Sequence, residues 1–199
     1  LAIDIDPKRA WILYLGTAGG GLFKSTSGGL DWKSANKGLT SPWVFSVAID
    51  RGNPAVIFSG AIGEIFTSTD GAASWTPLLS TGLPQAAVIG LQIDEHDSRT
   101  LYAAVREHGL YRSSDGGHSW TAIASSVPNA AEIPFTLAPG DSSGILLGSK
   151  GRGVYRSVDR GDTWKPSSKD MNQFVRSIAF HPSLPGVAYA GSLKAGVFK

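Results

Sequence analysis

The chain has 199 residues, a formal net charge of +2 and no cysteine. This length suits one domain with its own core, and the lack of cysteine excludes disulfides and thiolate metal sites. The small net charge gives no reason to expect nucleic acid or a membrane surface as a partner, and no apolar run reaches the roughly 18–20 residues of a membrane span. The chain opens on Leu1 rather than methionine, so we expect a processed or truncated chain of an extracellular or periplasmic protein whose export signal has been removed.

The first forty residues contain three strand-like segments before a turn-rich loop. The first segment ends in Ile5-Asp6-Pro7, the second runs from Trp11 to Gly16, and the third is Gly21-Leu22-Phe23-Lys24. Short β-rich runs bounded by Gly, Pro and Asp are typical of strands joined by turns. We name these strands a, b and c, and the strand expected after the loop is d.

The loop after strand c occurs four times, as S-x-D-x-G-x-x-W or a slightly altered copy. These repeat loops cover residues 25–32, 68–75, 113–120 and 157–164, and their serines are 43, 45 and 44 residues apart. Strands a, b and c return with the same period, and a fifth strand c, Gly196-Val197-Phe198-Lys199, ends the printed sequence. Self-similarity at such a fixed period indicates a repeat architecture.

The repeat unit predicts the fold. About 44 residues with four antiparallel strands is the size of one propeller blade, and no stretch has the sustained periodicity of a helix. We therefore predict an all-β β-propeller of four-stranded antiparallel blades, with four complete blades and a partial fifth that lacks strand d. One propeller domain or segment would span residues 1–199, with units at about 1–42, 43–86, 87–131, 132–173 and 174–199.

The repeat loops resemble the Asp-box, or bacterial neuraminidase (BNR), repeat, and the resemblance covers essentially the whole chain. It implies a fold rather than a function, because such blades occur in sialidases, xyloglucan-cleaving glycoside hydrolases, sortilin-type receptors and a photosystem II assembly factor. Short Ser and Asp side chains fix a tight turn by bonding nearby backbone N–H groups, and the Trp packs into the seam between strands. We therefore assign a structural role to the loop residues Ser25, Trp32, Ser68, Asp70, Trp75, Ser113, Asp115, Trp120, Ser157, Asp159 and Trp164.

Two repeat loops depart from the pattern. Ser27 stands in the first loop where the others have Asp, and Ala72 stands in the second where the others have Gly. Glycine adopts positive φ without steric cost, whereas alanine does not. We expect both turns to form, but to be less tightly specified.

The alternating chain direction predicts where a binding site lies. It places the a–b turns and the repeat loops on one face, and the b–c and d–a loops on the other. In the enzymes that carry such blades, ligands bind on the second face. Its loops have a basic bias, which could bind an anionic glycan, an acidic protein surface or a phosphate group, and the alternative is solvated Lys and Arg that serve solubility. The candidate binding residues are Arg106, His108, Lys150, Arg152 and Lys194.

Trp43 is a further candidate on this face. It lies outside the register of the repeat-loop tryptophans and follows Pro42 at the start of a strand a. An exposed Trp at this place could stack on a sugar ring, and the alternative is ordinary packing between blades.

The sequence assembles no catalytic set. A sialidase needs three convergent arginines and a Tyr nucleophile, whereas only Arg106 and Arg152 suit the face and every Tyr occupies a repeated strand position. Glycoside hydrolysis in general needs two paired carboxylates, and nothing pairs Glu64, Glu107 and Glu132. Most Asp residues belong to turns on the opposite face.

Two acidic residues near the start, Asp4 and Asp6, resemble those of xyloglucan-cleaving enzymes, although Asp6 also fits a repeated a–b turn. The four histidines are scattered without the spacing of metal ligands, so we expect neither a metal nor a cofactor.

The favoured interpretation is a non-catalytic interaction or scaffold module. Its b–c/d–a face would bind a protein complex, including a membrane-associated one, or a glycan. Two alternatives stay open: a carbohydrate-binding propeller, and a fragment of a sialidase- or xyloglucanase-like glycoside hydrolase. The open edge of the fifth unit leaves three arrangements open: a five-bladed ring with a three-stranded last blade, part of a six- to eight-bladed ring, or pairing with a strand of another chain, which would give an oligomer.

Overall fold

The computed structural model describes residues 2–128, 130, 134–168, 174–184 and 186–199. These residues form nineteen short strands in five antiparallel sheets, with no helix among them. The expected all-β, bladed architecture is confirmed. Among the described residues no helix is long and apolar enough to cross a membrane.

Each sheet is one blade, and its strands pair in chain order. Blade 1 contains β1 (Ala2–Ile5), β2 (Leu13–Gly16), β3 (Leu22–Ser25) and β4 (Lys33–Ser34). Blade 2 contains β5 (Ser46–Ile49), β6 (Ile57–Gly60), β7 (Ile65–Ser68) and β8 (Thr76–Leu78). Blade 3 contains β9 (Val88–Ile93), β10 (Leu101–Val105), β11 (Gly109–Ser113) and β12 (Thr121–Ala122).

Blades 4 and 5 follow the same plan. Blade 4 contains β13 (Phe135–Ala138), β14 (Asp141–Gly148), β15 (Val154–Ser157) and β16 (Lys165–Pro166). Blade 5 contains β17 (Val175–Phe180), β18 (Ala188–Ser192) and β19 (Val197–Phe198), so three strands form its sheet in the described residues. The second strand of blade 1 begins at Leu13 rather than at the expected Trp11, because backbone bonds from Arg9 to Asp6 and from Ile12 to Arg9 hold the preceding residues in a turn.

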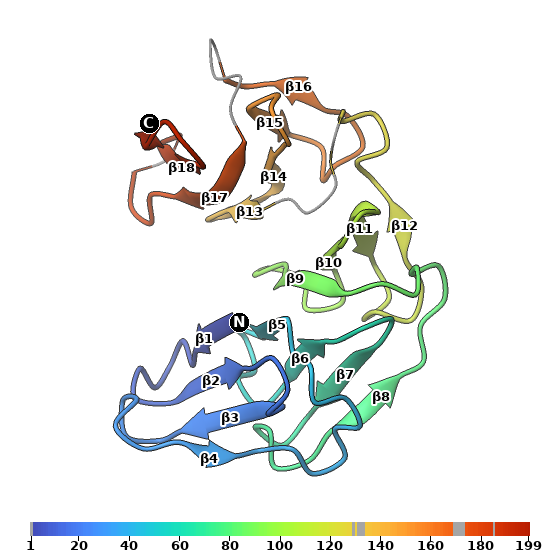
Figure 1. The fold of residues 1–199 in the computed structure, drawn as a ribbon, viewed down its shortest axis with the longest axis vertical. Helices are drawn as coiled ribbons and strands as arrows, with labels where there is room; N and C mark the ends of the chain where they lie inside the picture. The colour runs from blue at the N-terminus through green and yellow to red at the C-terminus, as the bar shows by residue number, and fades with distance from the viewer. Residues whose placement is uncertain (1, 129, 131–133, 169–173, 185) are drawn as a thin grey trace.

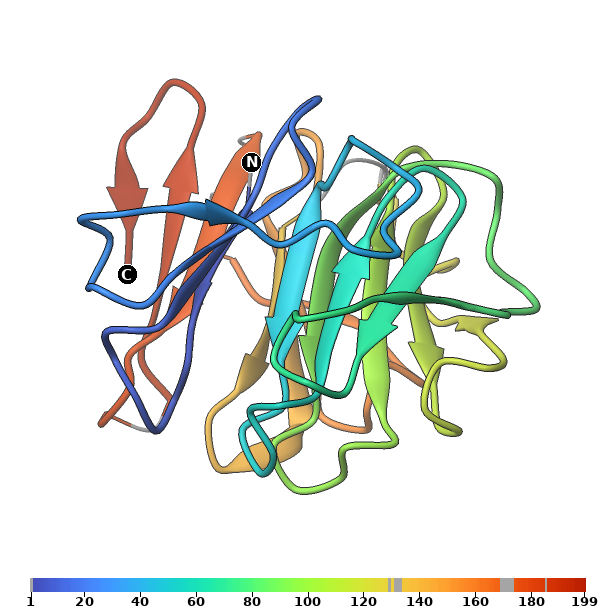
Figure 2. The same ribbon diagram turned by 90° about the horizontal axis from the view of Figure 1, so that it is seen from below.

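The five blades lie around a common centre with the first strand of each blade innermost (Figure 1). These inner strands contact one another in chain order, β1 against β5, β5 against β9, β9 against β13 and β13 against β17. Seen from the side, the strands run between two loop-bearing faces (Figure 2). The described residues therefore form five blades of a β-propeller.

Apolar side chains from facing blades form the core. Because side chains alternate across a strand, each blade presents one apolar set to the blade before it and another to the blade after it. Among the described residues, four clusters lie at the four successive interfaces between blades. At the first of them Tyr14 and Leu22 of blade 1 pack against Val47, Ile57 and their neighbours in blade 2.

The hydrogen bonds confirm the predicted polarity of the loops. On one face, repeat loops bond to a–b turns, as in the bonds from Gly71 to Ala55 and from Gly116 to Arg99. On the other face, b–c loops bond to d–a loops, as in the bond from Gly63 to Ala86. We call the face with the repeat loops and a–b turns the repeat-loop face. We call the opposite face the b–c/d–a face.

Candidate binding face

Three of the repeat loops have one common hydrogen-bond pattern. In the third loop Ser113 Oγ donates to Asp115 Oδ1 at 2.7 Å and accepts the Gly117 N–H at 2.9 Å. Asp115 also accepts the Ser119 N–H at 2.9 Å and the Ser119 hydroxyl at 2.5 Å. The loops at Ser68 and Ser157 repeat these bonds with distances that differ by 0.1 Å or less. Every polar atom of the serine and aspartate in this pattern therefore has a partner inside the loop.

This bonding sets the charge state of the loop aspartates. Hydrogen bonds from the following Ser or Thr and from the loop serine stabilise the carboxylate and lower the pKa of Asp70 and Asp159 to about 2. The same donors lower the pKa of Asp115. A carboxylate that stays ionised at neutral pH holds no proton to donate, so these groups are unsuited to general acid catalysis.

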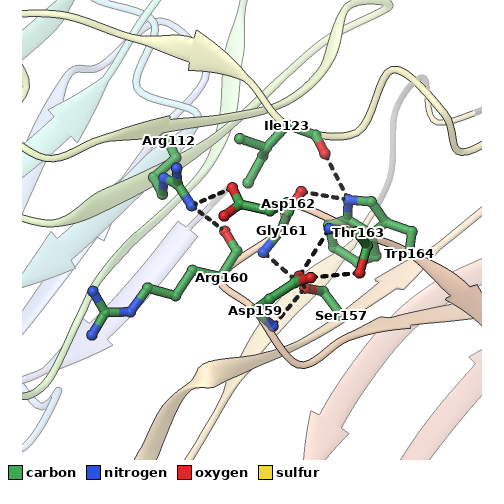
Figure 3. Close-up of polar contacts among 9 residues, drawn as sticks. All are labelled: Arg112, Ile123, Ser157, Asp159, Arg160, Gly161, Asp162, Thr163 and Trp164. Carbon is green, nitrogen blue, oxygen red and sulfur yellow. Dashed lines mark hydrogen bonds and ion pairs between the residues drawn. The ribbon is translucent and has the colours of Figure 1, made fainter.

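Two repeat-loop tryptophans donate to the blade before their own, whereas Trp120 donates to Gly117 of its own loop. Trp75 Nε1 donates to the Ala35 carbonyl of blade 1, and Trp164 Nε1 donates to the Ile123 carbonyl of blade 3. Figure 3 shows the second contact, in which Arg112 of blade 3 also reaches the Arg160 carbonyl and the Asp162 carboxylate of the fourth loop. Each such loop therefore fastens its own blade to the blade before it.

The two altered loops keep the turn. Ala72 adopts a φ of 66°, a value that favours glycine, and its N–H still donates to Ser68 Oγ at 2.9 Å. In the first loop Ser27 Oγ accepts the Asp31 N–H at 2.9 Å, but its contact with Ser25 Oγ is long, at 3.5 Å. The first loop thus has Ser27 where the other loops have Asp, and Asp31 where they have Ser or Thr. Its hydrogen-bond network is looser.

An aromatic and cationic cluster lies on the b–c/d–a face where blade 2 begins. Trp43 and Phe45 stack with their ring centroids 6.5 Å apart and an angle of 18° between planes, and the side chain of Trp43 is 46% exposed. The guanidinium carbon of Arg106, from the b–c loop of blade 3, lies 5.3 Å from the Phe45 centroid. A cation at this distance from a ring face is attracted by the ring quadrupole.

A second cluster of the same chemistry lies where blade 5 begins. Lys150 Nζ, from the b–c loop of blade 4, lies 5.8 Å from the Phe174 centroid, and the guanidinium carbon of Arg176 lies 5.0 Å from it. Trp43 and Phe174 occupy the same place in their blades, each directly before a buried valine. The structure thus brings two of the predicted binding cations, Arg106 and Lys150, onto aromatic rings.

The other predicted binding residues lie in loops of the same face. His108, Arg152 and Lys194 are exposed there, after β10, β14 and β18 respectively. The sequence reasoning missed Phe45, Phe174 and Arg176. The signal for the aromatic members was an aromatic residue next to a valine at the start of strand a, in Trp43-Val44-Phe45 and Phe174-Val175.

Several acidic side chains of the described residues are engaged by backbone N–H groups. Asp6, Asp50 and Asp94 each accept backbone N–H groups within an a–b turn, on the repeat-loop face. Asp4 accepts the Ile49 N–H of blade 2, and burial raises its pKa. Glu132 lies outside the described residues. Within the described residues no group of three or more His, Asp or Glu side chains could hold a metal ion.

Comparisons with known proteins place this geometry among propellers. No protein-family model matches the chain. A xyloglucanase from a Paenibacillus species is 30% identical in a match over 131 residues, and the match covers 55% of this chain and 13% of that protein. The chain thus spans a small part of this relative.

Solved structures resemble the fold at lower identity. An ancestral GH74 enzyme superposes with a TM-score of 0.78 at 22% identity, over 94% of this chain and 26% of that one. YCF48 bound to a D1 peptide superposes with a TM-score of 0.71 at 17% identity, over 99% of this chain and 63% of that one. These likenesses support the propeller fold, and the structural neighbours include both an enzyme and a peptide-binding protein.

Proposed function

We propose that this chain is a non-catalytic interaction module that binds an acidic segment of a protein partner through its b–c/d–a face. The observation that carries the proposal is the presence of two aromatic and cationic clusters on that face, Trp43–Phe45–Arg106 and Lys150–Phe174–Arg176. Both combine flat apolar rings with cations, which is the chemistry that recognises carboxylates on a polypeptide.

The composition of the clusters favours a protein partner. Tryptophan and arginine are enriched among the residues that dominate binding energy in protein interfaces. Arg106 and Lys150 each bring a cation to an aromatic ring of this face, and Trp43 offers an exposed apolar surface in the cluster of Arg106. The likeness to YCF48 bound to a D1 peptide supports the same class of ligand. The expected location outside the cytoplasm stays a prediction.

An array of acidic peptides tests the proposal directly. The chain should bind Asp- and Glu-rich peptides that contain aromatic residues, and binding should weaken as salt is raised because the attraction is between charges. Reversing the predicted cations, in a variant with R106E, K150E, R152E and K194E, should weaken binding at least tenfold.

A matched control carries four reversals of charge on other surfaces, K8E, K33E, R51E and R99E. It changes the net charge by the same amount, and should bind the peptides with nearly unchanged affinity. If both variants lose binding equally, net charge alone explains the attraction, and the proposed face is wrong.

Carbohydrate binding is the second candidate function. It is favoured by the exposed Trp43 ring and by the 30% identity with a xyloglucanase over part of the chain. A glycan array that includes xyloglucan fragments separates the two candidates. Glycan binding that is lost in Trp43→Ala, together with no peptide binding, would favour the carbohydrate function.

A fragment of a glycoside hydrolase is the third candidate. The measurement is release of reducing sugar from xyloglucan and from sialosides by the chain. We expect none, because Asp6, Asp50, Asp94 and the aspartates of the repeat loops serve turns of the repeat-loop face. Activity above that of the solvent blank would contradict the proposal of a non-catalytic module.

A further inference from the structure

A cavity of about 330 Å³ lies on the outer rim of the propeller, between blade 1 and the second repeat loop. The loop contributes Ala72 and Ala73 to its wall. Blade 1 contributes three lysines, which are Lys24 of β3, Lys33 of β4 and Lys37 beyond β4. The volume is within the range of small-molecule pockets, roughly 300–1,000 Å³. Three cations thus line one cavity, although the chain as a whole is nearly neutral.

A small residue of blade 1 leaves this space open. Ala35 follows the residue that pairs with the aromatic side chain of β3, and Leu78 and Ile123 hold the same place in blades 2 and 3. Leu78 and Ile123 pack against Gly117 and Gly161 of the repeat loop that follows each of them. Ala35 lines the cavity instead. The methyl group of Ala35 is too short to fill the space that the larger side chains fill elsewhere.

The second repeat loop also lacks a carboxylate that balances a cation at another seam. Between blades 3 and 4, Arg112 donates to a carbonyl of the fourth loop and to the carboxylate of Asp162 (Figure 3). Between blades 1 and 2, Lys24 likewise donates to the Gly71 carbonyl of the second loop at 2.7 Å. Ala73 stands where the fourth loop has Asp162. The cation contact to the carbonyl is therefore kept, and the contact to a carboxylate is not.

The strand pairing adds a second cation beside the first. Lys24 and Lys33 pair directly across β3 and β4, so their side chains project from the same face of the sheet. Like charges in this arrangement repel each other. In blade 3 the residue opposite Arg112 is the neutral Thr121. Burial, and then the charge of Arg9, lower the pKa of Lys24. A bound anion would offset the cost of holding these charges together.

The carboxylates near these lysines do not cancel their charge. Asp6 forms an ion pair with Arg9, and Asp70 accepts hydrogen bonds from serines of its own loop. Asp31 is the one acidic residue among those that line the cavity. In the described part of the chain, none of the three lysines forms an ion pair. Three cations and one carboxylate leave the cavity with an excess of two positive charges.

We propose that this cavity binds the phosphate group of a small phosphate monoester, with Lys24, Lys33 and Lys37 as its cations. A phosphate monoester carries a charge of about −1.5 to −2 at pH 7, which matches the excess charge of the cavity. Lysine binds phosphate as a point charge. The phosphate takes the place that the Asp162 carboxylate has at the other seam, and the organic group fills the space left by Ala35. This site is separate from the b–c/d–a face and does not depend on the function proposed for that face.

The probe is phenyl phosphate, and phenyl sulfate is the match with a single negative charge. Isothermal titration calorimetry at low ionic strength should show saturable binding of phenyl phosphate. The midpoint of thermal unfolding should rise with its concentration, because the ligand binds the folded state. Phenyl sulfate should bind several-fold more weakly. The affinity for phenyl phosphate should fall as the pH is lowered through about 6, where a monoester takes up its second proton.

Protein variants locate the site. Ala73→Asp supplies an internal carboxylate, and Ala35→Leu fills the space without a change of charge, so each should weaken binding at least tenfold. Lys33→Gln should weaken binding several-fold. Arg51→Gln, which removes an exposed cation from blade 2, should leave the affinity unchanged. Thermal unfolding without ligand verifies that each variant is folded. Binding of acidic peptides should be the same in Ala73→Asp as in the parent chain, because that binding concerns the other site.

Three results would overturn the proposal. The first is no saturable binding of phenyl phosphate up to millimolar concentration. The second is unchanged binding in both Ala73→Asp and Ala35→Leu, which would mean that phenyl phosphate binds elsewhere on the surface. The third is equal affinity for phenyl sulfate and phenyl phosphate, which would mean that the site does not select a doubly charged phosphate.

Discussion

The two faces of this propeller use polar residues in opposite ways. On the repeat-loop face, Ser and Asp side chains are bonded to their own loops, and the tryptophans are packed into the seams between blades. On the b–c/d–a face, Trp43 remains about half exposed, and cations are held over Phe45 and Phe174. The strongest sequence signal therefore marks the face that holds the blades together, and binding is better sought on the face with no motif.

The largest expected effect contrasts two tryptophans. Trp120 is 5% exposed, and Trp120→Ala should lower the free energy of unfolding by about 3–5 kcal/mol because it leaves a cavity between blades 2 and 3. Trp43→Ala should cost about 1 kcal/mol, the scale of one stacked aromatic pair. Urea unfolding monitored by circular dichroism measures both. Equal losses would remove the distinction between the two faces.

The next effect concerns a loop serine. Ser113→Ala deprives the buried Gly117 N–H of its acceptor and Asp115 of a donor, and should cost about 1–3 kcal/mol. Ser119→Ala at the exposed end of the same loop is the control, and should cost less. A larger loss in the control would mean that the serine does not organise the loop.

Acid should lower the stability that the loop aspartates give to the fold. The folded-state pKa of Asp70 and of Asp159 is about 2, below the ordinary value of 3.8. Their contribution to stability is therefore complete above about pH 4 and is lost as the pH falls toward 2. Thermal unfolding measured across this range should show the loss, and Asp159→Asn should flatten it. A variant with an unchanged pH profile would contradict this assignment.

The smallest effect tests the exchanged pair in the first loop. Ser27→Asp alone should give no gain, because it places a carboxylate beside Asp31, which already contacts Ser27. Adding Asp31→Ser recreates the pattern of the other loops and should raise stability by about 1 kcal/mol. A double-mutant cycle in urea measures this coupling. Additive effects of the two changes would contradict it.

The repeat made the blade order and the loop polarity predictable, because S-x-D-x-G-x-x-W encodes a turn through contacts within eight residues. The clusters at Phe45 and Phe174 were not predictable in this way. They depend on how a loop of one blade meets the start of another, as Arg106 meets Phe45. The residue types at positions 27 and 31 were visible in the sequence. That Ser27 and Asp31 bond to each other, with the two residue types in exchanged positions, could be recognised only from the structure.

The b–c/d–a face is the proposed binding surface, whereas the repeat-loop face holds the blades together. Hydrogen exchange of the chain with and without a bound acidic peptide tests it most directly. Protection should increase in the segments around residues 43–45, 106–108, 149–152 and 174–176, and should stay unchanged in the repeat loops. Protection confined to the repeat loops would contradict the proposed division of roles between the two faces.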